Sequence, residues 1–177
     1  MTRPPFDAPS PDDIATVSRQ LGRPARDVVG IAARCVCGAP TVVSTRPRLS
    51  DGTPFPTFYY LTHPAATAAV STLEAEGQMP GFAALLVGDV AEQYRAAHEQ
   101  YIADRESIAV VDEIAGISAG GMPDRVKCLH ALVGHALAAG PGVNPIGDLA
   151  LERSAWSPLV CECVPEVSTL STSSEAS

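Results

Sequence analysis

The sequence lacks any run of about 18 uncharged apolar residues, which is the length that a helix needs to cross a bilayer. Residues 1–7 also lack the basic and apolar regions of a signal peptide. These two absences predict a cytoplasmic protein without membrane insertion. The chain has 177 residues, of which 46% are hydrophobic, and this is enough to form the core of one ordinary domain.

Basic residues are also scarce. Lysine and arginine together number 12 against 20 aspartates and glutamates, so the formal net charge is −8. A nucleic-acid backbone repels such a chain, and no cluster of basic residues offsets the charge. We therefore expect no binding to nucleic acid.

Standard zinc signatures are missing, because the chain has no tight C-x₂₋₄-C pairs. It has five cysteines, an odd number that favours reduced thiols over a disulfide framework when no export signal is present. Four of them occur as Cys35-Val36-Cys37 and Cys161-Glu162-Cys163. We expect the second pair, close to the end of the chain, to be peripheral.

Capping residues predict the helices. Ser10 and Pro11 precede apolar residues at helical spacing and predict a short helix that stops at Gly22. Pro64 predicts the start of a helix over residues 65–76, and a charged amphipathic helix follows over about residues 90–108. Pro123 predicts the start of a further helix that ends at Gly140.

Residues 27–34 and 41–45 are rich in valine and isoleucine and flank a cysteine-bearing turn, which predicts a hairpin with Cys35 and Cys37 at its tip. Residues 55–62 predict a third strand. The order of elements indicates an α+β fold: a small, mainly antiparallel sheet of about three strands, packed with three to four helices on one face.

Composition sets the expected domain boundaries. Residues 1–10 are expected to be a flexible N-terminus, and residues 11–155 a single domain. Residues 156–177 lack a periodic apolar pattern and are rich in serine towards the end, so they are expected to form a disordered tail.

The predicted helix from Pro123 concentrates the reactive residue types. At about 100° per residue, Asp124, Cys128 and His135 fall on one side, roughly opposite an apolar stripe, and His130 lies at the edge of that stripe. Thiolate and imidazole side chains bind soft or borderline metals and act as nucleophiles or bases near neutral pH.

One interpretation is a metal site. Cys35 and Cys37 would supply two ligands if the turn brings both thiolates to one side. The remaining ligands would have to come from Cys128 and from His63 or one of the histidines of the helix after Pro123.

A second interpretation is an enzyme in which Cys128 is the nucleophile, His130 or His135 the base and Asp124 the group that orients it. The helical wheel favours His135. No standard cysteine-hydrolase signature surrounds these residues.

The glycine-rich segment before Pro123 offers a weaker signal. Gly120 and Gly121 would present backbone N–H groups to a small anion if a helix begins directly after them. The segment matches neither standard phosphate-binding glycine pattern.

Four segments together resemble the domain-of-unknown-function family 501, over about residues 12–150. They are Arg34-Cys35-Val36-Cys37-Gly38, residues 51–64, Lys127-Cys128-Leu129-His130 and Asn144-Pro145-Ile146-Gly147. This family is common in actinobacteria, where its gene tends to lie beside genes for a septum formation initiator protein and an exopolyphosphatase-like protein. The family has no assigned reaction.

The resemblance also bears on the metal ligands. In similar proteins the position of His63 is often cysteine, and both residues are good zinc donors. The resemblance therefore implies Cys35, Cys37, His63 and Cys128 as one ligand set, with His130 in reserve and zinc as the metal, iron being the alternative.

Three hypotheses follow. The first is a metal-binding domain with a structural or regulatory role, and the second is a Cys128-dependent enzyme. The third is a module that binds a protein partner in cell division or envelope growth, and it depends only on the association with neighbouring genes.

Overall fold

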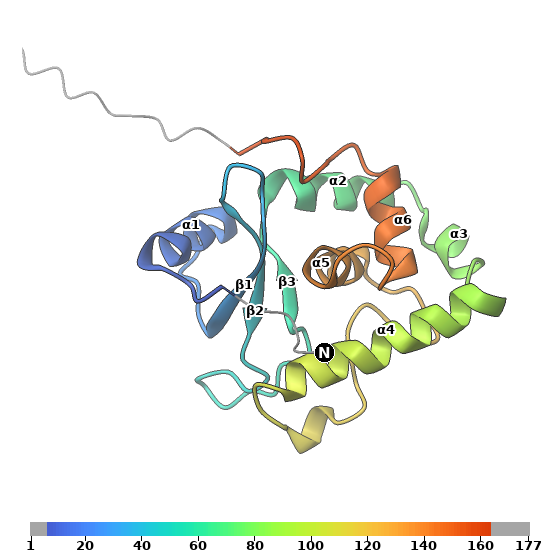
Figure 1. Cartoon of the computed structure of the whole chain (residues 1–177), viewed down its shortest axis with the longest axis horizontal. Coiled ribbons are helices and arrows are strands. Elements are labelled where there is room, and N and C mark those ends of the chain that lie inside the picture. Colours follow the sequence, from blue (N-terminus) through green and yellow to red (C-terminus); the bar gives the residue numbers. More distant parts are fainter. Residues whose placement is uncertain (1–6, 164–177) are drawn as a thin grey trace, which may run out of the picture.

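A three-stranded antiparallel sheet lies between helices in the computed structural model, which describes residues 7–163 (Figure 1). The predicted α+β class, with a small antiparallel sheet, is confirmed. The elements in chain order are α1 (Pro11–Leu21), β1 (Val28–Arg34), β2 (Pro40–Thr45), β3 (Tyr59–Leu61), α2 (Pro64–Ala75), α3 (Met79–Ala83), α4 (Gly88–Glu106), the 3₁₀ helix η1 (Asp112–Ile114), α5 (Leu129–Ala139) and α6 (Pro145–Arg153).

The sheet has helices on both faces, whereas the sequence predicted them on one. In β2, Val43 lies opposite Ile31 and Tyr60 and packs towards α1, where Val17 completes a small core. The neighbouring residue Val42 faces the main core on the other side. Every residue of this central strand is buried, which requires cover on both faces because successive side chains point to opposite sides.

The predicted hairpin and first helix are confirmed. Strands β1 and β2 form an antiparallel hairpin, and Cys35 and Cys37 lie in the turn that connects them. Helix α1 begins with a capping box, in which the Ser10 side chain accepts from the Asp13 N–H and the Asp13 carboxylate accepts from the Ser10 N–H.

Helix α5 is the centre of the main core and appears end-on in Figure 1, between the sheet and α6. The prediction that it starts at Pro123 is wrong, because α5 begins at Leu129. The preceding residues fold into turns closed by backbone bonds. Lys127 N–H donates to the Gly120 carbonyl over 2.7 Å, and Arg125 N–H donates to the Gly121 carbonyl over 2.9 Å.

Two α-helices, α3 and α6, and the 3₁₀ helix η1 were not predicted, although α6 has a clear signal. The Asn144 side chain accepts from the Gly147 N–H and Pro145 occupies the first turn of α6, which is a standard helix start. Helix α3 has only five residues and no side-chain cap.

The first residues after α6 contact the rest of the domain. Trp156 is buried, and the Pro158 carbonyl accepts from the Val36 N–H at the hairpin tip over 3.2 Å. Within residues 156–163, assigned to the predicted disordered tail, the contacts with the domain are made by Trp156, Pro158 and Cys163. The rest of that predicted tail, and residues 1–6 of the predicted flexible N-terminus, lie outside the described residues.

Within residues 7–163, no helix is both long enough and apolar enough to cross a membrane.

The close approach of α5 and α6 depends on Gly147. A Cβ atom at this position would lie 2.2 Å from the Leu132 carbonyl oxygen. We expect Gly147→Ala to destabilise the protein by about 1–3 kcal/mol, because the two helices would have to separate. Gly81→Ala is the matched control, since it also lies in a helix and its Cβ would meet nothing within 4 Å. Urea denaturation should show this control unchanged or slightly more stable, and equal stability of the two variants would contradict the packing argument.

Candidate metal centre

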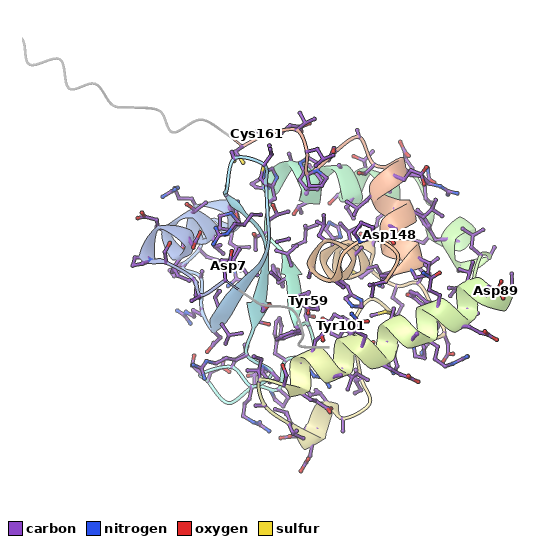
Figure 2. All side chains as sticks on the ribbon, in the orientation of Figure 1. Asp7, Tyr59, Asp89, Tyr101, Asp148 and Cys161 are labelled. Atoms are coloured by element: carbon purple, nitrogen blue, oxygen red, sulfur yellow. The ribbon has the colours of Figure 1, made fainter. Side chains whose placement is uncertain are left out.

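Four cysteines from two segments that are far apart in the sequence lie close together. Cys35 and Cys37 come from the β1–β2 turn, and Cys161 and Cys163 come from the segment after α6. Their four sulfur atoms all lie within 4.8 Å of one another, and the Cys37 and Cys163 Sγ atoms are 3.4 Å apart. Figure 2 shows Cys161 beside the hairpin tip. All five cysteines of the chain are free thiols.

The tight turn explains how a C-x-C pair directs both sulfurs to one side. Cys35 N–H donates to the Ala39 carbonyl and Gly38 N–H donates to the Cys35 carbonyl, each over 2.8 Å. Gly38 has a φ of +91°, a conformation that other residues rarely adopt. The chain is therefore bent between the two cysteines instead of extended, where alternate side chains would point apart.

Arg34 steadies the base of this turn. Its guanidinium donates to the Asp13 carboxylate over 2.7 Å and to the Gly38 carbonyl over 2.9 Å. The hydrogen bonds from Arg34 hold the pKa of Asp13 well below its usual range, although partial burial opposes this. The residue before Cys35 thus links the turn to helix α1.

The pKa values of Cys35, Cys37 and Cys163 are shifted in different directions. Interaction with the backbone N–H of Ala39, and then with Cys163, lowers the pKa of Cys37 to about 7. Burial raises the pKa of Cys35, and burial together with the neighbouring thiols raises the pKa of Cys163. Four thiolates this close repel one another, so full ionisation of the cluster requires a nearby cation.

His63 lies at the edge of this cluster and is fully buried. As N-cap of α2, its Nδ1 atom accepts from the Ala66 N–H over 3.4 Å. A neutral ring that accepts at Nδ1 carries its proton on Nε2. That Nε2 atom is 3.2 Å from the Cys163 Sγ, so His63 is placed to donate to this sulfur. Burial lowers the pKa of His63, which favours the neutral ring.

Cys128 and His130 lie in a second cluster, with Glu74. The Cys128 sulfur, a His130 ring nitrogen and a Glu74 oxygen are within 4.8 Å of one another. Glu74 Oε1 accepts from the Leu129 N–H over 2.7 Å and lies 3.3 Å from His130 Nδ1. On the other side of the ring, Nε2 is 3.2 Å from the Thr67 carbonyl oxygen and 3.1 Å from the Ser71 Oγ.

Comparison with known proteins places the chain in a family. The sequence model of a family described as "Protein of unknown function (DUF501)" matches residues 31–152, more than half of the chain. The chain belongs to the DUF501 family. No curated protein and no solved structure matches it. The matched part of this DUF501 protein contains Cys35, Cys37 and the whole Cys128 cluster, whereas Cys161 and Cys163 lie beyond it.

The structure divides the ligand set that the sequence predicted for this DUF501 protein. His63 precedes α2 and Glu74 lies in its last turn, so the two clusters are separated by about 16 Å along this helix. Cys35, Cys37 and His63 lie at one end and Cys128 and His130 at the other. Cys161 and Cys163, expected to be peripheral, complete the first cluster. The repeated C-x-C spacing was the only sequence signal for that pairing.

The predicted alignment of Asp124, Cys128 and His135 does not form, because residue 124 precedes α5. Asp124 is exposed in the turn region. His135 is fully buried in the DUF501 core, with its ring stacked on Tyr59 at 5.6 Å between centroids and edge-on to Tyr101 at 5.1 Å. Figure 2 shows the two tyrosines close together beside α4. The histidine beside Cys128 is His130.

Gly120 and Gly121 are also placed differently from the prediction. Their carbonyls close the turns before α5, and the first residue of that helix follows eight positions after Gly121. The glycine N–H groups therefore do not form the N-terminus of a helix, which was the basis for the predicted anion site.

The geometry of His63 generates a prediction about its proton. We expect long-range ¹H–¹⁵N NMR spectra of the DUF501 protein to show the neutral Nε2–H tautomer, because Nδ1 accepts from the Ala66 N–H. Because burial lowers its pKa, the ring should stay neutral below its ordinary pKa of about 6.5. A proton on Nδ1, or a metal-bound Nε2, would contradict the arrangement.

Proposed function

We propose that this DUF501 protein is a zinc-binding domain in which Cys35, Cys37, Cys161 and Cys163 hold one metal ion with a structural or regulatory role. The observation that carries the proposal is the meeting of two C-x-C pairs, far apart in sequence, with all four sulfurs within 4.8 Å of one another. Four thiolates are a ligand set typical of structural zinc. Cys128 and His130 belong to the separate cluster with Glu74.

The spacing of the sulfurs fits a tetrahedral ion. Zinc–sulfur bonds of about 2.3 Å place the sulfurs of a tetrahedral site roughly 3.8 Å apart. The Cys37–Cys163 distance of 3.4 Å is slightly below this value, and every other pair lies within 4.8 Å. Small side-chain rotations would therefore suffice to bind the ion.

Charge and hydrogen bonding support the same proposal. A divalent cation would relieve the repulsion that opposes ionisation of four neighbouring thiols. His63 Nε2 is placed to donate to Cys163, and the Ala39 N–H favours the thiolate of Cys37. Such second-layer donors orient metal ligands and stabilise their charge.

The proposed role follows from what the ion would connect. Four protein ligands leave no open coordination position, which is typical of structural sites and not of catalytic ones. The ion would hold the segment after α6 against the hairpin tip. The Val36–Pro158 backbone hydrogen bond already joins these two segments. Binding or loss of the metal would then control the order of this segment, and this is the regulatory form of the proposal.

Metal analysis of protein purified without an affinity tag tests the proposal. We expect about one equivalent of zinc per chain, lost in a Cys37→Ser, Cys163→Ser double variant because two of four ligands are removed. Cys128→Ser is the matched control, since this cysteine belongs to the other cluster, and it should retain the metal. Amide exchange should rise at Val36 and over residues 157–163 when a chelator removes the metal, while β2 stays protected.

Two results would contradict the proposal in different ways. Folded, metal-free wild-type protein that takes up no zinc on titration would refute the metal centre. One equivalent of iron, lost in the double variant, would refute zinc but retain the thiolate site.

A further inference from the structure

Cys128, His130 and Glu74 form a cluster of reactive side chains that take no part in the proposed metal centre. It joins the last turn of α2 to the first turn of α5, at the opposite end of α2 from the four cysteines. All three residues are partly accessible, with 26% of the His130 side chain and 29% of the Glu74 side chain exposed. A small molecule could therefore reach them.

The partners of His130 determine the protonation of its ring. Nδ1 faces a Glu74 carboxylate oxygen that already accepts from the Leu129 N–H, and Nε2 faces the Thr67 carbonyl. A carboxylate and a backbone carbonyl accept hydrogen bonds and cannot donate them. A hydrogen on each ring nitrogen satisfies both acceptors, and His130 is then an imidazolium cation. The Ser71 hydroxyl lies 3.1 Å from Nε2 and can accept a hydrogen bond from it or donate one to it.

A cation in this position acts on the neighbouring sulfur. Two titratable groups face the Cys128 thiol, namely His130 from α5 and Glu74 from α2. Interaction with His130 lowers the pKa of Cys128, while burial and the Glu74 charge oppose this change. In return, interaction with Cys128 and Glu74 raises the pKa of His130. A ring with hydrogen on both nitrogens also has no lone pair to offer a metal.

We propose that Cys128, His130 and Glu74 form a nucleophilic cysteine site for acyl groups and related carbon electrophiles. Cys128 supplies the thiolate, His130 the proton, and Glu74 the carboxylate that holds the ring. Covalent catalysis uses these three kinds of group, a nucleophile, a base and an orienting carboxylate, and here their reactive atoms lie within 4.8 Å of one another. The site is independent of the proposed metal centre, since the two share no residue.

The balanced reaction assigns each proton. The Cys128 thiolate attacks the carbonyl carbon, the S–C bond forms, and the bond to the leaving group breaks as that group takes a proton from His130. Water then attacks the thioester while giving a proton to the neutral His130 ring. The S–C bond breaks, the carboxylic acid leaves, and the thiolate and imidazolium are restored.

Alkylation of the full-length protein by iodoacetamide tests the thiolate. Peptide mass spectrometry reports each cysteine separately, so the wild-type chain suffices. A thiol with an ordinary pKa of 8.5 would slow roughly 75-fold between pH 8 and pH 6, and we expect the alkylation rate of Cys128 to fall by clearly less than this factor. p-Nitrophenyl acetate should acetylate Cys128, releasing p-nitrophenolate.

Variants separate the roles of the neighbours. His130→Gln should slow alkylation of Cys128 at pH 6 at least about tenfold, with recovery at pH 9, because the thiolate has lost its cation. His98→Gln is the matched control, since His98 lies on α4 and pairs with Ser118, and it should leave the rate unchanged.

Glu74→Gln should lower the NMR titration midpoint of His130 in folded protein, because Glu74 raises the pKa of this ring.

Two outcomes would overturn the proposal. One is alkylation of Cys128 that follows the steep pH dependence of an ordinary thiol. The other is a second equivalent of metal that protects Cys128 and is lost in Cys128→Ser, which would make the cluster a metal site. Neither outcome affects the four-cysteine centre, whose metal content is measured in the Cys37→Ser, Cys163→Ser variant.

Discussion

The fold depends on how closely the backbone of α5 can approach its neighbours. A Cβ atom at Gly134 would lie 3.2 Å from the Tyr59 carbonyl oxygen, and one at Gly147 would lie 2.2 Å from that of Leu132. These two glycines let α5 pack directly on β3 and on α6. Because protein cores pack densely, the position of α5 in the core also determines where its N-terminal end lies. The place of Cys128 beside the end of α2 is a consequence of that packing.

Helix α2 sets the distance between the two clusters. One end contributes His63 to the four cysteines, and the other contributes Glu74 to Cys128. The chemistry at the two ends differs because the charges differ. Four adjacent thiols need an external cation to ionise together, whereas a single thiol at the other end has a cation supplied by the protein itself, the ring of His130.

Local signals explain what could be predicted from the sequence. Ser10, Pro11 and Asp13 specify the start of α1 within one turn, and the apolar segments around Cys35 and Cys37 specify a hairpin through neighbours in sequence. The contact between Cys37 and Cys163 depends instead on how the segment after α6 crosses the domain. Local signals also failed to predict the start of α5. Residues 123–128 have helical periodicity, but they form turns in which the Gly120 and Gly121 carbonyls accept backbone hydrogen bonds. A helical wheel assumes that such turns are absent.

The extent of the family match distinguishes the two clusters. Residues 31–152 include Glu74, Cys128 and His130, together with the strand and helices that position them. They include only half of the four-cysteine centre, since Cys161 and Cys163 follow the matched part. The Cys128 cluster is therefore contained entirely in the domain that defines the family. The metal centre needs, in addition, a segment beyond that domain, and its proposed role in fastening this segment to the hairpin tip agrees with that position.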